Sequence, residues 1–300
     1  MLMYKIKIGI NGAISLHKEF GVSYFQLLRS LLSKNKTIAI QFKGLPFTIS
    51  IYDRLIIGDS LLNAKKSGWK IADISNDLVL YENKQRGLKL YSSIDDHLFY
   101  IHIIDEVFVK EIYKANFDNK VVIDVGAYHG ESAIYFVMKG AKRVIALEPD
   151  EDSYKLALMN IRENLSEKDL ENKILLLKKA LAPNKGVINF YKFPHSPVSN
   201  SIDPNNIETN DKIVTQVEAI TLDDVIKIAG EERIGLLKLD CEGCEYLVLN
   251  SFSNFDIVDN IILEYHHGLQ NLPSLLKARG FEVKIVKGDK NTGILKAYKK

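Results

Sequence analysis

The stretch that decides the fold is VVIDVGAYHGES, residues 121–132. Its apolar run Val121–Val125 carries a carboxylate at Asp124, and Gly126 and Gly130 then bound a short loop that leads into a helical pattern. A short apolar run followed by an amphipathic stretch is typical of a parallel strand and its covering helix. Ligands of open α/β sheets bind at the carboxyl edge of the strands, beside the first such loop. The stretch therefore predicts an open α/β sheet with a ligand at this edge.

The same alternation continues along the rest of the chain. Apolar runs of five to seven residues are separated by amphipathic stretches with helical spacing. The order predicts a doubly wound, mostly parallel sheet with an antiparallel strand at its C-terminal end. The expected elements are strand 121–125, helix 131–139, strand 143–147, helix 151–164, strand 174–178, strand 186–193, strand 234–240, helix 242–250, strand 260–264, helix 271–279, strand 281–286 and strand 293–298.

The part of the chain before this pattern has a different character. Helical spacing at 22–33 and 105–115 encloses two predicted hairpins, one across 36–52 about a Gly44–Pro46 turn and one across 78–91. No recognisable site chemistry accompanies them. We therefore predict two domains, a small α+β extension at 1–105 and an α/β domain at 106–300.

Composition limits the class of protein. The chain has 300 residues, of which 46% are hydrophobic, and 40 Lys+Arg against 38 Asp+Glu leave a formal charge of +2. No overall field would draw such a protein onto a polyanion or an acidic membrane. No apolar stretch approaches the length of a membrane span, and the N-terminus lacks the pattern of a signal peptide. We expect a cytoplasmic protein without a membrane span.

Cys241 and Cys244 are the only cysteines, and they are too few to cross-link a secreted fold. We expect them to be buried thiols in a reducing compartment. A metal site that adds His266 and His267 to the pair is not expected, because adjacent histidines lack the spacing of structural zinc ligands. We therefore predict no metal site.

A second carboxylate suggests which ligand binds at the sheet edge. Glu148 ends the second strand, at about the distance from Gly126 at which a carboxylate accepts hydrogen bonds from both ribose hydroxyls. The loop is G-x-x-x-G, however, whereas a dinucleotide pyrophosphate needs G-x-G-x-x-G. Glu131 also places negative charge where a phosphate would lie. These features indicate an adenosine-type ligand that carries an ammonium group, and S-adenosylmethionine fits.

Three segments of the chain resemble the FkbM family of S-adenosylmethionine-dependent methyltransferases. They are VVIDVGAYHGESAIYF with VIALEPDEDSYKLALMNIREN, then KKALAPNKGVINFY, and ITLDDVIKIAGEERIGLLKLDCEGCEYLVL. The resemblance implies a class I, Rossmann-like methyltransferase domain that methylates a hydroxyl on a sugar, polyketide or related metabolite. It also implies that residues 126–130 hold the methionine part, Glu148 the ribose and Ala180 the adenine edge. The predicted cofactor-binding residues are Asp124, Gly126, Ala127, Tyr128, Gly130, Ser132, Glu148, Pro149 and Ala180.

Candidate catalytic residues follow the later strands. Asp240 ends one strand, Glu242 begins the next helix, and His266 follows the fifth strand, so all three belong to the same sheet edge. A histidine with an ordinary pKa is mostly neutral at pH 7 and can act as a general base. We therefore expect Asp240 or His266 to take the acceptor's proton. The polar stretch 193–210 is expected to be a solvated loop or a lid over the acceptor, with His195, Asn200 and Ser201 as its hydrogen-bonding residues.

Two other functions remain open at this point. An NAD(P)-dependent oxidoreductase would use the same strand, loop and acidic residue, and a non-catalytic binding protein could keep the fold without the chemistry. Nucleic acid is not indicated, because the only credible basic patch is a set of lysines in the last strands. The predicted acceptor is a small molecule or a glycan hydroxyl.

Overall fold

The computed structural model describes residues 37–42, 45–193, 197–204, 211–231 and 233–299. The chain forms two compact units, Met1–Ile112 and Tyr113–Lys300. The helix predicted at 22–33 and the loop residue His195 lie outside the described residues. None of the described helices is both long and apolar enough to cross a membrane.

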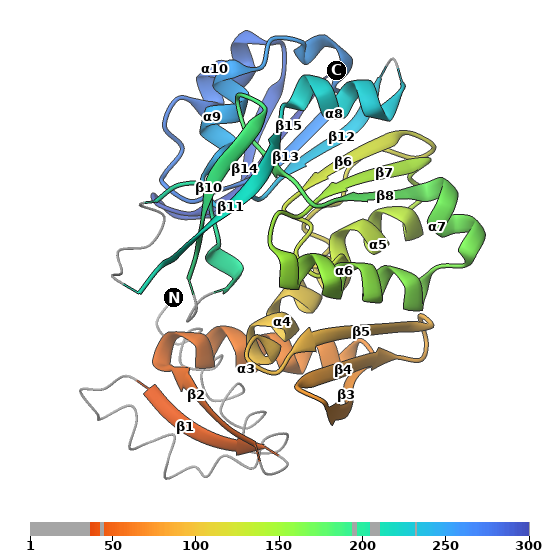
Figure 1. Cartoon of the computed structure of the whole chain (residues 1–300), viewed down its shortest axis with the longest axis vertical. Coiled ribbons are helices and arrows are strands. Elements are labelled where there is room, and N and C mark those ends of the chain that lie inside the picture. Colours follow the sequence, from red (N-terminus) through yellow and green to blue (C-terminus); the bar gives the residue numbers. More distant parts are fainter. Residues whose placement is uncertain (1–36, 43–44, 194–196, 205–210, 232, 300) are drawn as a thin grey trace. The chain divides into compact units, whose positions relative to one another are not determined.

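The first unit combines short sheets with helices (Figure 1). The predicted hairpin at 78–91 is confirmed by the antiparallel pairing of β4 with β5, and β3, which the sequence did not predict, extends this sheet. Helical structure near 105 ends at Val109, as a π-helix continuous with α4, instead of reaching residue 115. The elements are β1 (Thr37–Phe42), β2 (Leu45–Ser50), α3 (Ile51–Lys66), β3 (Trp69–Ser75), β4 (Leu78–Asn83), β5 (Leu88–Ser93), α4 (His97–Ile104) and a π-helix (Asp105–Val109).

The second unit is built on a large, mostly parallel sheet. Among the described residues seven strands lie in the order β14-β15-β13-β12-β6-β7-β8, and β15 runs antiparallel between β13 and β14. This is the doubly wound, mostly parallel sheet with an antiparallel strand at its C-terminal end, as predicted. The strands are β6 (Val121–Val125), β7 (Arg143–Leu147), β8 (Ile174–Leu177), β12 (Ile234–Leu239), β13 (Asn260–Tyr265), β14 (Glu282–Gly288) and β15 (Gly293–Tyr298).

Helices cover the sheet on both faces, as right-handed crossovers require. Figure 1 shows α5 and α6 on one side of the strands and α8 on the other. The predicted helices are confirmed within one or two residues at most ends. The predicted helices are α5 (Glu131–Met138), α6 (Glu151–Asn164), α9 (Cys244–Ser251) and α10 (Leu272–Ala278), and the structure adds α7 (Glu167–Lys173) and α8 (Leu222–Ala229).

A smaller sheet lies outside the parallel one. The predicted strand at 186–193 is β10 (Gly186–Lys192), which pairs antiparallel with β11 (Ile213–Ile220), and β11 runs parallel to the short β9 (Ala180–Leu181). Ser201, from the loop between β10 and β11, forms an antiparallel bridge to Tyr191. The part of this loop that is described therefore lies against the hairpin.

The core explains why the central strands read as continuous apolar runs. Every residue of β6 and of β12 is buried, because helices cover both faces of the sheet. One cluster of buried hydrophobic residues extends from Val121 to Ala297 and consists of residues of the second unit. Polar side chains within this interior must find partners, and these partners define the site described below.

The expectation of free thiols is wrong. Cys241 and Cys244 form a disulfide, with their Cα atoms 5.4 Å apart. The bond closes the turn between β12 and α9, where strand and helix bring the two residues together. The cysteine content is therefore no longer an argument for a reducing compartment.

Candidate functional site

The loop after β6 packs directly against the end of β12. The N–H groups of Gly126 and Ala127 both donate to the carbonyl oxygen of Leu147, at 3.0 Å. Gly126 has φ of +77°, and a Cβ there would lie 1.8 Å from the carbonyl oxygen of Asp240. Only glycine permits this approach, so the first glycine of the motif brings the loop onto the strand that carries Asp240.

Glu148 is joined to the same loop. One carboxyl oxygen accepts the N–H of Tyr128 at 2.9 Å, and the other accepts the N–H of Asp150 at 2.9 Å. Tyr128 has φ of +47°, a left-handed conformation that turns its N–H toward Glu148. Burial raises the pKa of Glu148 to about 8, against the opposing effect of these hydrogen bonds. The predicted juxtaposition of the glycine loop with Glu148 is thus present in the structure.

Asp124 is completely buried at the end of β6. It accepts a hydrogen bond from Ser132 Oγ at 2.7 Å, and its other oxygen lies 3.3 Å from the ammonium of Lys238. Burial raises the pKa of Asp124, while Lys238 and Ser132 act in the opposite direction. The ammonium group that the sequence analysis expected opposite Asp124 is therefore supplied by the chain itself.

Lys238 is a residue that the sequence analysis missed. Its side chain is buried within β12, and its ammonium donates to the carbonyl oxygens of Gly126 at 2.6 Å and Val125 at 3.2 Å. It also lies 5.2 Å from the centre of the Tyr113 ring. A lysine inside the otherwise apolar run Ile234–Leu239 was the available signal, because a strand buried on both faces must pair such a charge. Lys238 therefore holds the start of the glycine loop in place through these two carbonyl oxygens.

Asp240 stands at the carboxyl end of β12, partly exposed. Its Oδ2 accepts a hydrogen bond from the Tyr113 hydroxyl at 2.8 Å and lies 3.6 Å from Lys238 Nζ. Its Oδ1 faces His266 Nε2 at 3.9 Å. Tyr113 could not have been found from the sequence, because it is separated from Asp240 by 127 residues and stands outside any motif.

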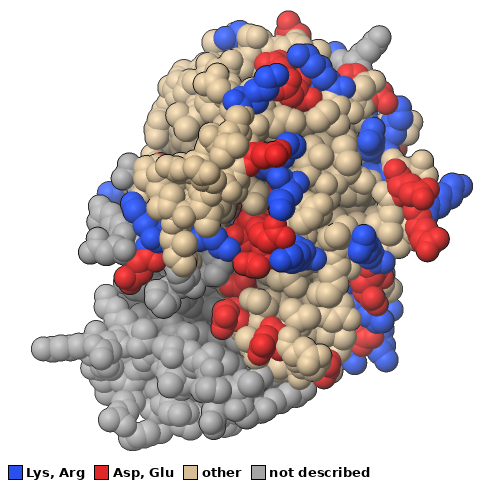
Figure 2. Space-filling view, viewed as in Figure 1, with Lys and Arg blue, Asp and Glu red and all other residues tan. Residues whose placement is uncertain are grey.

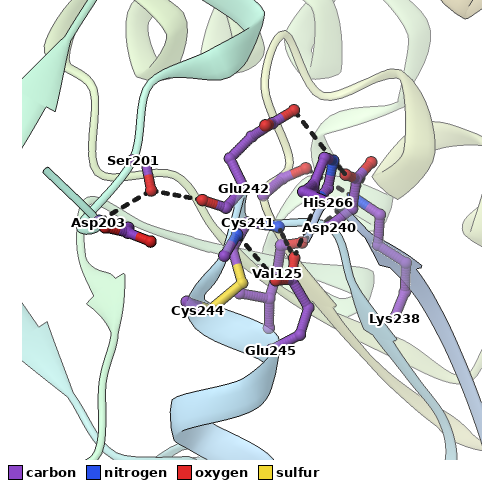
Figure 3. Close-up of a disulfide and its surroundings, with 12 residues drawn as sticks. Val125, Ser201, Asp203, Lys238, Asp240, Cys241, Glu242, Cys244, Glu245 and His266 are labelled. Atoms are coloured by element: carbon purple, nitrogen blue, oxygen red, sulfur yellow. Dashed lines mark hydrogen bonds and ion pairs between the residues drawn. A yellow bond between two sulfur atoms is a disulfide. The ribbon is translucent and has the colours of Figure 1, made fainter. Parts of the chain in front are cut away.

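The turn after Asp240 is held by several independent contacts (Figure 3). Glu242 and Gly243 both have positive φ, +56° and +112°. The buried carboxylate of Glu245 accepts the N–H groups of Cys241 and Gly243, each at 2.8 Å. Ser201 Oγ donates to the carbonyl oxygen of Glu242, and the disulfide closes the turn. Glu245 is therefore a structural cap of this turn.

His266, at the end of β13, faces three carboxylates. Its Nε2 lies 3.2 Å from Glu242 and its Nδ1 lies 3.7 Å from Glu245, in addition to the contact with Asp240. Burial lowers the pKa of His266, but the hydrogen bond and charge of Glu242, with Glu245 and Asp240, raise it to about 10. The expectation of an ordinary, mostly neutral histidine is therefore wrong. An imidazolium has no lone pair to accept a proton, so His266 is poorly suited to be the base.

The remaining predicted residues occupy varied positions. Ala180 is buried at the start of β9, beside Ala219 of β11, and Pro149 is half-buried next to Glu148. Gly130 caps α5 with φ of +83°. Of the predicted lid residues that are described, Asn200 accepts the N–H of Phe193 at 2.8 Å and Ser201 contacts the 240–245 turn.

Comparison with known proteins gives one match to a protein-family model. Residues 124–283, more than half of the chain, match the model described as "Methyltransferase FkbM domain". The chain is 26% identical over 215 residues to Methyltransferase sdnD of Sordaria araneosa, which covers 60% of this chain and 82% of that protein. It is also 26% identical over 166 residues to the ribosomal protein L11 methyltransferase of Carboxydothermus hydrogenoformans, covering 53% of each. The chain thus spans about half the length of this second relative.

Solved structures add distant similarities. The FkbM methyltransferase of Methylobacillus flagellatus is 14% identical, with a TM-score of 0.45, over 72% of this chain and 57% of that one. TrmK of M. capricolum, crystallised with S-adenosylhomocysteine, is 13% identical, with a TM-score of 0.36, over 63% of this chain and 66% of that one. The family match begins at the buried Asp124 of the first strand and extends past the turn that carries Asp240 and Glu242. On the strength of that match, this chain belongs to the FkbM family of methyltransferases.

Proposed function

We propose that this protein transfers the methyl group of S-adenosylmethionine to a hydroxyl oxygen of a small molecule or glycan. The single observation that carries the proposal is the junction of the glycine loop with Glu148, in which the Tyr128 N–H donates to the Glu148 carboxyl group. This contact places a tightly packed backbone loop beside a carboxylate that can bind ribose hydroxyls, at one edge of the sheet. The chain also belongs to a methyltransferase family.

The described residues fit such a cofactor. Gly126 and Gly130 let the loop pack closely against the chain, because a Cβ at either position would meet backbone atoms of Asp240 or Ala157. Each oxygen of Glu148 accepts one backbone N–H and keeps a further lone pair for a ribose hydroxyl. In the proposal, residues 126–130 would hold the methionine part and Glu148 the ribose, with Pro149 and Ala180 near the adenine. Asp124 and Ser132 act indirectly, since they hold Lys238 and the first turn of α5.

S-adenosylmethionine supplies an electrophilic methyl group that needs no further activation. The protein must orient the acceptor and remove its proton, and positioning of this kind contributes about 7–11 kcal/mol toward lowering a barrier. Asp240 is the carboxylate that we assign to the proton, because it is partly exposed and its Oδ1 is turned away from Lys238. Lys238 and Tyr113 hold its other oxygen in place.

The charge distribution argues for a small acceptor. Figure 2 shows basic and acidic side chains intermingled over the described residues of the face in view, without a continuous basic surface there. A polyanionic acceptor such as RNA would instead favour a basic surface and a steep dependence of binding on salt. We therefore favour a hydroxylated metabolite or glycan as the acceptor.

The oxidoreductase alternative is disfavoured by the first turn of α5. Glu131 is buried there, so that a carboxylate occupies the helix N-terminus where a pyrophosphate would need positive potential. NADH should accordingly show no fluorescence enhancement when it is titrated with the protein.

Titration calorimetry with S-adenosylhomocysteine tests the proposal. We expect one molecule bound per chain, and at least tenfold weaker binding by Glu148→Ala, since hydrogen bonds to charged groups contribute about 1.5–3 kcal/mol. Mass spectrometry of reactions with hydroxylated acceptors should then show a methylated product. Absence of any binding by the wild-type protein would refute the proposed function, while binding without turnover would favour a non-catalytic role.

A further inference from the structure

The side chains that meet beyond the glycine loop form a set of metal-ligand type. Asp240 Oδ1, Glu242 Oε1 and His266 Nε2 come from the end of β12, the following turn and the end of β13, and such ligand atoms of the three residues all lie within 4.8 Å of one another. The sequence alone predicts no metal site, because the cysteine pair with His266 and His267 lacks the spacing of structural zinc ligands. We propose that Asp240, Glu242 and His266 bind a divalent cation whose open positions hold the acceptor oxygen.

The spacing of the three atoms suits a single ion. His266 Nε2 lies 3.2 Å from Glu242 Oε1 and 3.9 Å from Asp240 Oδ1. Ligands at right angles around an ion lie about 3.0 Å apart when each bond is about 2.1 Å long. Small shifts would therefore place all three atoms on one face of an octahedral ion. The opposite face would remain for water or acceptor oxygens.

The surroundings of His266 also suit a metal ligand. A metal ion at Nε2 displaces the proton that the imidazolium carries there, and Nδ1 keeps its own proton, which usually points to a carboxylate or carbonyl oxygen. Here Nδ1 is buried and faces Glu245 Oε1 at 3.7 Å. Glu245 is itself fixed by the N–H groups of Cys241 and Gly243, so it cannot swing away from the imidazole. The structure thus supplies the outer carboxylate that orients a histidine ligand.

The backbone of the turn and the charges around His266 also support a cation site. Glu242 contacts His266 from a turn whose backbone is held by the disulfide and by Ser201 (Figure 3). Asp240 Oδ2 already contacts Tyr113 and Lys238, so Oδ1 is the oxygen that can bind the proposed ion. The three carboxylates gathered around His266 give a divalent cation a favourable potential.

The inference rests on the proposed methyl transfer and changes one role within it. Asp240 becomes a ligand, and the acceptor hydroxyl, bound to the cation, loses its proton to water because a bound cation lowers the pKa of a coordinated hydroxyl. The acceptor oxygen then forms the new C–O bond while the S–CH₃ bond breaks, and that electron pair stays on sulfur. An oxygen-rich acceptor, with a second oxygen near the hydroxyl, is the class that such a site selects.

Manganese binding to the full chain tests the site without any assay of activity. Chelator-treated protein, with its disulfide intact, is titrated with Mn²⁺ while free Mn²⁺ is followed by electron paramagnetic resonance. We expect one Mn²⁺ per chain, and at least tenfold weaker binding by His266→Ala and by Glu242→Gln. His267→Ala is the matched control, because His267 is the neighbouring, exposed histidine and contacts Asp203 instead. It should bind Mn²⁺ like the wild type.

Two results would overturn the inference. One is the absence of stoichiometric Mn²⁺ binding, which would leave His266 and Glu242 as a simple ion pair. The other is unchanged binding by both His266→Ala and Glu242→Gln. Calorimetry with S-adenosylhomocysteine on the metal-free protein and on each variant reports separately on the cofactor site and on folding. The two failures can therefore be distinguished. If only the metal site is wrong, Mn²⁺ does not bind but S-adenosylhomocysteine does; if the proposed function is wrong, S-adenosylhomocysteine does not bind.

Discussion

The charge on Glu148 should control how tightly the cofactor binds. Burial raises the pKa of Glu148 to about 8, so that the unliganded protein carries it mostly protonated at neutral pH. The charged carboxylate is the better acceptor for ribose hydroxyls. We therefore expect the affinity for S-adenosylhomocysteine to increase as the pH rises from 6.5 to 9. Calorimetry across this range measures the effect, and Glu148→Gln should remove the pH dependence while it weakens binding.

The same shift has the opposite effect on stability. A carboxyl group whose pKa is about 8 when folded binds its proton more tightly than in the unfolded chain, where 4.5 is the ordinary value. Its contribution to the free energy of unfolding is complete below pH 4.5 and is lost as the pH rises toward 8. Glu148 thus favours folding at acid pH and cofactor binding at alkaline pH.

Gly126 should be irreplaceable for a steric reason that can be separated from its backbone angle. Gly126→Ala places a Cβ 1.8 Å from the carbonyl oxygen of Asp240, whereas Gly230, with a similar φ of +66°, has nothing within 4 Å of an added Cβ. Gly230→Ala should cost about 1 kcal/mol, through its left-handed angle alone. Urea unfolding should show a clearly larger loss for Gly126→Ala, and equal losses would contradict the proposed collision.

Lys238 should be needed for folding because of the carboxylates around it. Lys238→Met leaves Asp124 and Asp240 without their shared cation, and removal of one partner from a buried ion pair costs about 3–5 kcal/mol. The control is Lys284→Met, on the exposed face of β14, which should change the free energy of unfolding by less than about 0.5 kcal/mol. A stability of Lys238→Met close to that of the wild type would contradict this role.

The turn between β12 and α9 depends on its covalent link. In the chain-entropy model, a disulfide that closes so short a loop stabilises a protein by roughly 2 kcal/mol. The double variant Cys241→Ser/Cys244→Ser should lose about this amount in urea unfolding. Dithiothreitol should lower the stability of the wild type to the same extent and leave the variant unchanged. If dithiothreitol also destabilised the variant, reduction of this disulfide would not explain the loss of stability in the wild type.

Most elements were predictable because their environment is uniform. Strands β6, β7 and β12 are buried on both faces, so their apolar runs give the correct bounds within a residue. Strand β11 was missed because it is half exposed and so lacks a continuous apolar run. The position of β10 in the sequence does not reveal where its pairing partner lies. Helix α3 was missed because its charged and apolar residues show almost no helical segregation.

The candidate site was predictable only in part. Glycines and strand-end carboxylates have local signals, so Gly126, Glu148 and Asp240 could be named in advance. The contacts of these residues could not be predicted. Lys238 and Tyr113 make theirs across long sequence separations, and the disulfide was not expected. The charge state of His266 follows from three carboxylates that meet only in the folded chain.

The two compact units of the chain should differ in their independence. One cluster of buried hydrophobic residues lies wholly between Val121 and Ala297, so the unit Tyr113–Lys300 contains apolar packing of its own. We expect a fragment of residues 113–300 to unfold cooperatively and to bind S-adenosylhomocysteine. Circular dichroism and calorimetry of the fragment check this. An unfolded fragment would mean that the first unit is required for the fold.

The position of β15 has a consequence for synthesis of the chain. This strand, Gly293–Tyr298, is inserted between β13 and β14, although it follows both in the sequence. Until it emerges from the ribosome, the nascent protein displays an unpaired apolar edge on β13, which invites association with other chains. Translation that stalls or stops shortly before Gly293 should therefore yield an aggregating product that depends on chaperones, even though every residue of the glycine loop has been made.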